Sequence, residues 1–333
     1  MKIGILFGGN SLEHEISIIT AYQVKSKIEK RYDVYMLYLD FDNNLYIANK
    51  CSIGDFKLGK PKKLKKTSFI GGGVKGIKLD SVIIAAHGEN TEDGVCAGVL
   101  RFYNIPFVGC DILPSSLCMN KYISYKMLNS NGIPMLETKL ITYEDYINGI
   151  IIDEYPIILK PVYGGSSIGI EVAYNKDELD LVLSKLFKDY KEIICQKYYE
   201  NIEEYNMAVC SSFVSALERI NKKSGFFTFE NKYTDSFKLM HQEINDTNLD
   251  EFRKISEDVY KLINASGIIR IDYFVIDNKI YVNEINTIPG ALAMYLFSDF
   301  DFVIDDLIKK SIIEHRVIYH RGNFLVKSEI NKW

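Results

Sequence analysis

The first forty residues alternate between apolar runs and a helical pattern, and this order restricts the fold more than any other feature of the chain. An apolar run at 2–7 meets a glycine pair at once, and the segment 13–30 places its apolar side chains near helical spacing. A second apolar run follows at 33–40. Strands that alternate with helices predict a parallel sheet whose binding loops lie at the carboxyl ends of the strands.

The remaining sequence predicts further units, because 333 residues are too many for one typical core. An α+β unit begins near Pro114 with a helix at 120–132, and a later unit contains a long hairpin at 267–287. We therefore predict three domains: an N-terminal α/β domain over 1–114, a central subdomain over 115–204 and a C-terminal subdomain over 205–333.

Composition excludes several classes of protein. The net charge is −4 and no basic block occurs, so we expect no nucleic-acid partner. No apolar run is long enough to span a membrane, and the first one is too short for a signal peptide. The six cysteines form no C-x-x-C pair, which indicates reduced thiols and a cytoplasmic protein.

The hairpin at 267–287 carries the most chemical information. Arg270 and Asp272 share one face of its first strand, and Glu284 and Asn286 share one face of its second strand. A three-residue turn would set Asp272 opposite Glu284, whereas a two-residue turn would put the two pairs on opposite faces. A common polar face therefore requires the longer turn or a β-bulge.

Two interpretations of that polar face are open. Asp272, Glu284 and the amide oxygen of Asn286 would make an all-oxygen site that suits Mg²⁺. Alternatively, the four side chains form an ionic ladder in which Arg270 pairs with Asp272 or Glu284. The polar run "NEINTIPG" favours the metal, because such a strand end is costly to bury unless something binds there.

The stretch "KPVYGGSSIGIEV" at 160–172 predicts a phosphate-binding loop. Its spacing fits neither the P-loop nor the dinucleotide fingerprint. The glycines allow close approach of the main chain, and Ser166 and Ser167 can donate to phosphate oxygens. Lys160 at the strand end and Lys121 at the start of an earlier helix would supply positive charge, although either lysine alone could be solvated.

Other polar residues fall where strands end. The strand that includes 195–199 could offer backbone groups to an adenine edge, and Glu204 could accept from ribose hydroxyls. In the first unit, Glu13 could receive an ammonium group, and His87 could contact a carboxylate or phosphate.

Seven motifs appear in an order that resembles one family. They are "GGNSLEHEIS", "HGENTEDG", "NK" at 120–121, "ILKPVYGGSSIGI", "ENKY" at 230–233, "RIDYF" and "NEINTIPG". Together they resemble the D-alanine–D-alanine ligases of the ATP-grasp superfamily over nearly the whole chain. The resemblance implies a three-domain ATP-grasp fold of α/β and α+β class, with a Rossmann-like N-terminal parallel sheet.

The resemblance also implies a reaction, in which ATP activates one D-alanine as an acyl phosphate and the amine of a second D-alanine displaces phosphate. It implies ATP as co-substrate, two Mg²⁺ or Mn²⁺ ions, peptidoglycan precursor synthesis and a homodimer. The catalytic residues that it implies are Glu13, Ser166, Tyr233, Arg270 and the backbone N–H of Gly290. Those implied for amino-acid binding are His87, Lys232, Tyr295 and Leu296. Those implied for ATP are Lys121, Lys160, Ser166, Ser167, Gln196, Lys197, Tyr198, Tyr199, Glu204 and Asn283. The metal ligands implied are Asp272, Glu284 and Asn286.

The sequence departs from the family pattern after the Pro-Gly turn, where Tyr295 and Leu296 replace a usual Ser-Leu pair. This leaves D-serine or another acceptor as an alternative to the second D-alanine. Lys232 and Tyr233 argue for an amine acceptor. A nucleotide-binding homologue without catalytic activity is the alternative from another class of protein, and retention of Arg270 speaks against it.

Overall fold

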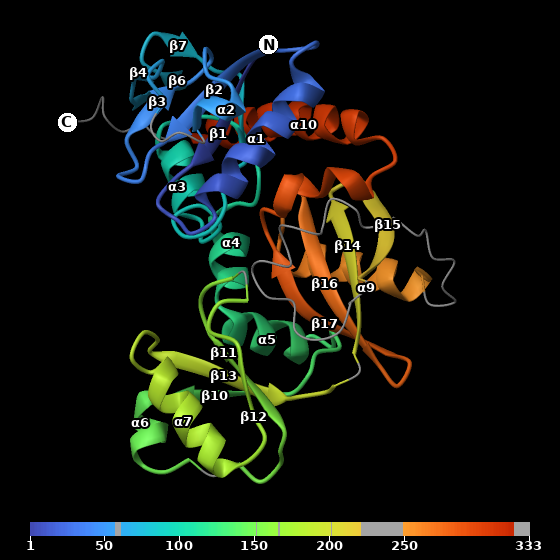
Figure 1. Ribbon diagram of the computed structural model, residues 1–333. Coiled ribbons are helices and arrows are strands. Elements are labelled where there is room, and N and C mark those ends of the chain that lie inside the picture. Colours follow the sequence, from blue (N-terminus) through green and yellow to red (C-terminus); the bar gives the residue numbers. More distant parts are fainter. Residues whose placement is uncertain (57–60, 151, 166, 201, 221–248, 323–333) are drawn as a thin grey trace, which may run out of the picture. The chain divides into compact units, whose positions relative to one another are not determined.

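The computed structural model describes residues 1–56, 61–150, 152–165, 167–200, 202–220 and 249–322. Figure 1 labels its helices and strands. Contacts group the chain into two units. Unit 1 comprises 1–112, 266–268 and 288–333, and unit 2 comprises 113–265 and 269–287. The three predicted domain boundaries are not tested by this grouping and stay a prediction.

Unit 1 is built on a six-stranded sheet in the order β4-β3-β2-β1-β8-β9. Strand β1 pairs in parallel with β2 and β8, and β8 pairs in parallel with β9, which confirms the predicted parallel sheet. The elements of this layer are β1 (Lys2–Gly8), α1 (His14–Ile28), β2 (Asp33–Leu39), β3 (Leu45–Ile47), β4 (Lys65–Lys66), β8 (Ser81–Ile84), α3 (Val95–Phe102), β9 (Phe107–Val108) and α10 (Phe300–Gly322).

The parallel pairing follows from burial on both faces of β1, whose residues from Ile3 onward are all buried. Helix α1 turns Ala21, Val24 and Ile28 inward, and all three are fully buried. The polar excursion between β3 and β8 forms only short elements: α2 (Ile53–Phe56), β5 (Phe69–Ile70), β6 (Gly73–Val74) and β7 (Ile77–Lys78). Among the described helices, none has the length and apolar character needed to cross a membrane.

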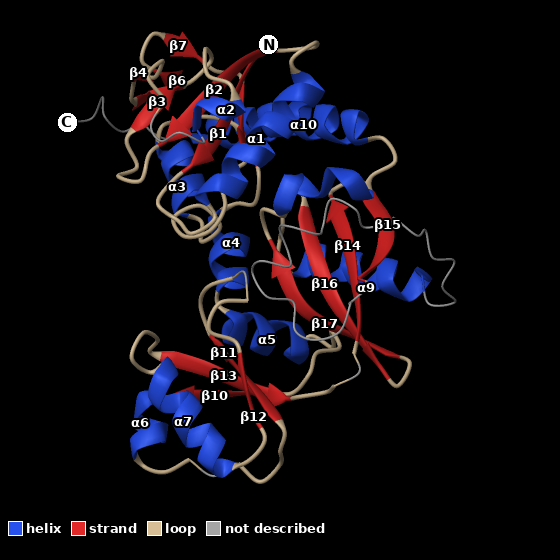
Figure 2. Cartoon of the chain, viewed as in Figure 1, coloured by secondary structure: helices blue, strands red, loops and turns tan. Residues whose placement is uncertain are grey.

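Unit 2 contains two four-stranded antiparallel sheets, and the first has the order β10-β13-β11-β12 (Figure 2). Its elements are α4 (Ile112–Met119, whose first residue belongs to unit 1), α5 (Lys121–Ser130), β10 (Thr138–Thr142), α6 (Tyr143–Ile147), β11 (Ile157–Pro161), β12 (Glu171–Ala173), α7 (Lys176–Leu186) and β13 (Glu192–Lys197).

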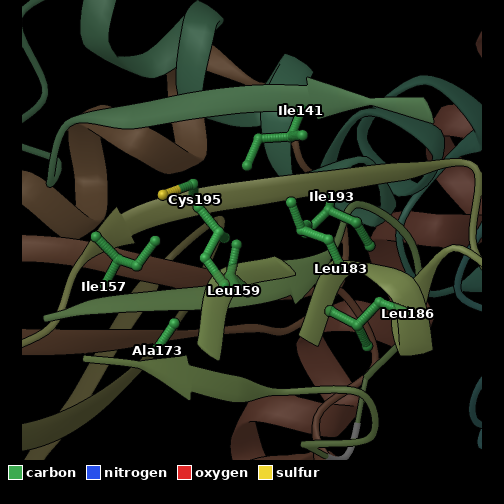
Figure 3. Close-up of a cluster of buried hydrophobic side chains, with 9 residues drawn as sticks. Ile141, Ile157, Leu159, Ala173, Leu183, Leu186, Ile193 and Cys195 are labelled. Carbon is green, nitrogen blue, oxygen red and sulfur yellow. The ribbon is translucent and has the colours of Figure 1, made fainter. Parts of the chain in front are cut away.

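One face of this sheet is covered by α7 (Figure 3). The helix begins at the cap Asn175, whose side chain accepts from the backbone N–H of Glu178. Leu179, Leu183 and Leu186 follow with helical spacing and are almost fully buried against the sheet. Each such leucine contributes about 1.5–3 kcal/mol by leaving water. The sheet therefore has one apolar face and leaves its other face for Lys160 and Gln196.

The second sheet of unit 2 has the order β15-β14-β16-β17 and packs on α9. The ring of Phe252 on α9 lies 5.3 Å from Tyr205 and 5.1 Å from Tyr273, and Ser256 bonds the Tyr273 hydroxyl at 2.7 Å. The elements are β14 (Glu203–Cys210), β15 (Phe213–Ile220), α9 (Leu249–Leu262), β16 (Ile269–Ile276) and β17 (Lys279–Asn286).

The six cysteines are all buried, and none of them forms a disulfide. Burial raises the pKa of the Cys96 and Cys110 thiols to about 12, so neither forms a thiolate near neutral pH. This agrees with the prediction of reduced core thiols.

The turn after β17 has an unusual backbone. It forms the 3₁₀ segment η2 (Gly290–Leu296), in which Ala291, Leu292 and Ala293 have φ of 52°, 48° and 50°. A left-handed conformation costs about 1–2 kcal/mol for each residue with a Cβ atom. Three such residues in succession need strong support from the surrounding structure.

A close chain crossing lies elsewhere in unit 1, where Gly267 passes Gly109. The hydroxyl of Ser266 donates to the Gly109 carbonyl at 2.8 Å. A Cβ on Gly267 would lie 2.7 Å from the Gly109 Cα, and Gly267 has a φ of 68°.

We predict that Gly267→Ala lowers the free energy of unfolding by about 2–5 kcal/mol, from left-handed strain plus overpacking against the backbone. Gly132→Ala is the matched control, because Gly132 also has a positive φ (80°) but nothing lies near its Cβ position. It should lose only about 1–2 kcal/mol. Urea unfolding measures both, and equal losses would contradict the role of the crossing.

Candidate active site

Two loops meet at the carboxyl edge of the parallel sheet in unit 1. The first follows β1, and the second follows β8 and begins at His87. The hydroxyl of Ser11 donates to the His87 carbonyl at 2.7 Å. A Cβ on Gly88 would lie 2.7 Å from that hydroxyl oxygen, so only glycine allows this approach. The prediction that both loops open at one edge of the sheet is confirmed.

Glu13 lies where these loops meet. Its backbone N–H donates to the Ser11 hydroxyl at 3.0 Å, and its carbonyl accepts from the Ser17 backbone at 3.0 Å. Its carboxylate lies beside the second loop, because a Cβ on Gly88 would be 3.5 Å from Glu13 Oε2. The predicted role of Glu13 in binding an ammonium group stays a prediction.

His87 is 3% exposed, and both of its ring nitrogens have hydrogen-bond partners inside unit 1. Its Nε2 lies 2.9 Å from the Thr20 hydroxyl, and its Nδ1 lies 2.9 Å from the Ile288 carbonyl and 3.4 Å from a carboxylate oxygen of Glu92. Gly290 starts the left-handed turn two residues after Ile288. The predicted contact of His87 with a substrate carboxylate stays a prediction.

The two residues after the Pro-Gly turn differ in exposure. Tyr295 is 39% exposed, whereas Leu296 is buried at 4%. A tyrosine hydroxyl can bond a carboxylate, whereas a buried leucine side chain offers only apolar contact. Their predicted part in acceptor binding is untested.

The hairpin of unit 2 has a two-residue turn and a β-bulge. Asp277 and Asn278 have φ of 49° and 60°, and Ile276 pairs with Lys279 across the turn. The register then shifts between Asp272 and Tyr273. The shift restores the common polar face that a two-residue turn alone would destroy.

Because of the bulge, Asp272 pairs with Glu284, and Arg270 pairs with Asn286, as the sequence required. The extra residue is Asn283, which joins Glu284 on the side away from the core.

Asp272 is the centre of a hydrogen-bond network on this face. Arg270 donates to its two oxygens at 2.7 and 2.9 Å, and the Asn286 amide donates at 3.1 Å. Asn206 lies on the neighbouring strand β14. With the oxygen and nitrogen of its amide exchanged, its amide nitrogen donates to Asp272 Oδ1 at 3.1 Å. The ionic ladder considered above is therefore present in part, through the Arg270–Asp272 pair.

Lys160 faces this sheet from the other sheet of unit 2. The residue is 8% exposed, its Nζ donates to Asn283 Oδ1 at 3.3 Å, and it lies 5.7 Å from the centre of the Phe274 ring. Phe274 and Asp272 lie on the same face of β16. A nearly buried cation thus lies beside the polar face of the hairpin.

The glycine-rich loop after β11 is joined to the start of α5. The Lys121 backbone donates to the Val162 carbonyl at 3.1 Å, and its ammonium group donates to the Gly164 carbonyl. Asn120 caps the helix and donates its amide to the Tyr163 hydroxyl at 2.8 Å. Lys121 is therefore at the loop, as a phosphate contact requires.

Gln196 presents a buried acceptor on the same sheet face as Lys160. Its amide nitrogen donates to Thr138 Oγ1 at 2.8 Å, and the Thr138 hydroxyl donates in turn to the Leu136 carbonyl at 2.9 Å. A carbonyl only accepts, so the amide orientation of Gln196 is fixed. Its Oε1 is buried, and no donor among the described residues reaches it.

The other residues assigned to the nucleotide lie in three parts of unit 2: the end of β13 with the segment after it, strand β14, and the glycine-rich loop. Lys197 is exposed with its Nζ 5.6 Å from the Tyr199 ring centre, and the backbone N–H of Tyr198 donates to the Pro156 carbonyl at 2.9 Å. Glu204 shares the face of β14 that carries Asn206. Ser167 has a φ of 61° in the glycine-rich loop.

Three residues of the predicted site, Ser166, Lys232 and Tyr233, lie outside the described residues. Three residues that the sequence reasoning missed are Thr20, Thr138 and Asn206. Asn206 had a signal, because it is a polar residue directly before the apolar run that ends its strand. Thr20 and Thr138 had none, since their partners are far away in the sequence.

Comparison with known proteins adds independent findings. The family profile described as "D-ala D-ala ligase N-terminus" matches residues 2–110, and "D-ala D-ala ligase C-terminus" matches 127–302. A D-alanine–D-alanine ligase from a Nitratiruptor species is 35% identical over 324 residues, covering 93% of each chain. One from Helicobacter pylori is 35% identical and covers 100% of each chain.

Solved structures agree with these relatives. The D-alanine–D-alanine ligase of Helicobacter pylori superimposes with a TM-score of 0.78 at 31% identity, covering 93% of this chain and 98% of that one. The VanG D-Ala:D-Ser ligase of Enterococcus faecalis gives a TM-score of 0.78 at 26% identity, covering 93% and 99%.

Unit 1 has a parallel sheet, and unit 2 has two antiparallel sheets that Lys160 joins through Asn283. With the match to solved ligase structures, this fold defines an ATP-grasp protein. Within that class, the chain belongs to the D-alanine–D-alanine ligase family. The predicted fold class and family are thereby confirmed.

The network around Asp272 predicts a difference in stability between two ion pairs. Asp272→Asn removes the charge of the carboxylate that pairs with the mostly buried Arg270 guanidinium, and should lower the free energy of unfolding by about 1–3 kcal/mol. Glu203→Gln breaks the half-exposed Arg219–Glu203 pair and should change stability little. Denaturant unfolding without divalent ions measures both, and similar losses would contradict the central role of Asp272.

Proposed function

We propose that this chain joins two D-alanine molecules to D-alanyl-D-alanine with conversion of ATP to ADP and phosphate. The observation that carries the proposal is the polar face of the hairpin, where Arg270, Asp272, Glu284 and Asn286 lie together beside the buried Lys160. Membership of the ligase family supports the same reaction. We propose a cytoplasmic role in supplying peptidoglycan precursors, and a homodimer as the working form.

Several polar groups of unit 2 support the proposal that the chain binds ATP. The buried Oε1 of Gln196 is an acceptor that the exocyclic amine of adenine would satisfy. Lys160 and Lys121 supply positive charge for phosphates, and the backbone of the glycine-rich loop can approach them closely. Glu204 would accept from a ribose hydroxyl of the nucleotide.

Two divalent cations fit the donor chemistry of this face. Asp272, Glu284 and Asn286 offer carboxylate and amide oxygens, which are the ligands that Mg²⁺ prefers and Mn²⁺ accepts. No cluster of three His, Cys, Asp or Glu residues occurs in the described part of the chain, and this set contains only two carboxylates. The bound ions would neutralise charge on the phosphates of ATP.

The residues then divide the reaction between them. Glu13 holds the ammonium group of the first D-alanine, whose carboxylate attacks the γ-phosphorus while ADP leaves. The amine of the second D-alanine attacks the acyl carbon, and phosphate leaves as that amine loses a proton. Arg270 and the Gly290 N–H stabilise the oxyanion between these events; one such donor contributes about 3–4 kcal/mol to lowering a barrier.

The second substrate is the open part of the proposal. Tyr295 stands where many relatives have serine, and a structural relative is named a D-Ala:D-Ser ligase. Lys232 and Tyr233, in the sequence outside the described residues, favour an amine acceptor over a hydroxy acid. We therefore propose D-alanine as the acceptor, with D-serine or another amino acid as the alternative.

Product analysis tests this function directly. The purified chain, with ATP, Mg²⁺ and D-alanine, should release phosphate and give D-alanyl-D-alanine by mass spectrometry. Reactions that offer D-serine or D-lactate beside D-alanine identify the acceptor. Phosphate release that does not depend on D-alanine would contradict the proposal, and no turnover at all would favour a catalytically idle nucleotide-binding protein.

We predict that Glu284→Gln lowers kcat at least about 100-fold, because it replaces a charged metal ligand and leaves phosphate charge uncompensated. The fold should remain, since Glu284 lies on the polar face away from the core. Lys279→Gln on the same strand is exposed and serves as a control with normal activity. Wild-type turnover by Glu284→Gln at low Mg²⁺ would exclude Glu284 as a metal ligand.

A further inference from the structure

The left-handed turn of unit 1 has a strained backbone, and its sequence does not relieve that strain. Ala291, Leu292 and Ala293 all carry a Cβ atom, yet all three have positive φ. No glycine occupies these positions to relieve the strain. Strained backbone persists where the surrounding structure over-determines it, and such places gather at functional sites.

Apolar packing provides part of that support. Leu292 is 5% exposed, Ala293 is fully buried, and the Leu292 backbone N–H donates to the Pro289 carbonyl at 2.8 Å. Helix α1 is the element that packs against the turn. The buried side chains hold the end of the turn, and the Leu292–Pro289 hydrogen bond closes the backbone around Gly290.

Two buried side chains hold the start of the turn. The Ala291 backbone N–H donates to the Thr20 hydroxyl oxygen at 3.1 Å, and the His87 ring contacts the Ile288 carbonyl at 2.9 Å. Thr20 is 1% exposed and His87 is 3% exposed. The two are themselves joined, Thr20 Oγ1 to His87 Nε2, at 2.9 Å.

The protons in this chain of bonds can be assigned. The Ile288 carbonyl and the Glu92 carboxylate only accept, so His87 Nδ1 carries the hydrogen that faces them. The Ala291 N–H only donates, so Thr20 accepts from it. In the neutral imidazole, the Thr20 hydroxyl then donates to Nε2, and every partner is satisfied.

We propose that Thr20 and His87 are positioning residues for the backbone N–H of Gly290. That N–H belongs to the peptide between two restrained points, the Ile288 carbonyl before it and the Ala291 N–H after it. Fixing both neighbours fixes the direction in which the Gly290 N–H points. The inference rests on the proposed function, because it gives that N–H the task of binding the oxyanion.

The test compares Thr20→Val, which keeps the shape and removes the hydroxyl, with Thr20→Ser, which keeps the hydroxyl. Thr20→Val should lower kcat about 10- to 100-fold, because a small misplacement of a catalytic group costs up to about 100-fold. The KM for ATP should stay within about twofold, since the residues assigned to ATP lie in unit 2. Thr20→Ser should keep kcat within about threefold of the wild type.

A control variant separates positioning from general loss of stability. Ser256→Ala removes another buried hydroxyl, bonded to Tyr273 at 2.7 Å on the core side of unit 2. It should lower the unfolding temperature while kcat remains normal. A folded Thr20→Val with normal kcat, or with only a raised KM, would overturn the proposal.

Hydrogen exchange gives a second measurement that needs no catalysis. The Ala291 amide should exchange slowly in the wild type and in Thr20→Ser, and at least about tenfold faster in Thr20→Val. Where Thr20→Val fails to fold, Thr20→Ala replaces it, because it also removes the hydroxyl that accepts from the Ala291 N–H. Unchanged exchange at Ala291 would sink the proposal, whereas an inactive wild type would instead count against the proposed function.

Discussion

The carboxylate of Asp272 organises the polar face on which the chemistry of unit 2 depends. It accepts hydrogen bonds from Arg270 on its own strand and from Asn286 and Asn206 on the strands to either side. Such a convergence exists only if all three strands keep one register. The bulge in the hairpin provides that register, because without it Asp272 would not face Glu284.

Lys160 adds a second electrostatic constraint. A lysine that is only 8% exposed is unfavourable unless polar partners surround its ammonium group, and Asn283 is one of those partners. The same bulge places Asn283 on that face. One backbone irregularity therefore positions both a proposed metal ligand and a partner of the proposed phosphate-binding lysine. Dipoles and charges held in advance are what an enzyme needs to stabilise phosphoryl transfer without reorganisation.

In unit 1, the unfavourable local feature is a strained backbone rather than a buried charge. The left-handed turn at 291–293 is opposed by local conformational preference and is held by packing and by the Thr20–His87 pair. Both units thus maintain unfavourable local features through tertiary contacts. Such features relax when their support is removed, which makes their supporting residues the informative ones to change.

Much of the fold could be predicted from local patterns. The apolar run at 2–7 and the helical spacing that follows it indicate a parallel sheet, because side-chain periodicity is a local property. The same holds for helix α7 and for the alternation of Arg270 and Asp272 on one strand face. Predicted helix ends differed from the observed ones by a few residues, as at α5, where the helix spans Lys121–Ser130 rather than 120–132.

By itself, the sequence determined the strand and helix order, the residues available for the site and, through its ordered motifs, the family. Only the tertiary structure decided that a bulge aligns Asp272 with Glu284, that Thr138 orients Gln196, and that Thr20 and His87 hold the turn at Gly290. The reason is physical: register shifts and buried hydrogen bonds join residues far apart in the sequence, here 201 positions between His87 and Ile288 and 271 between Thr20 and Ala291. Side-chain periodicity carries no information about partners at such separations.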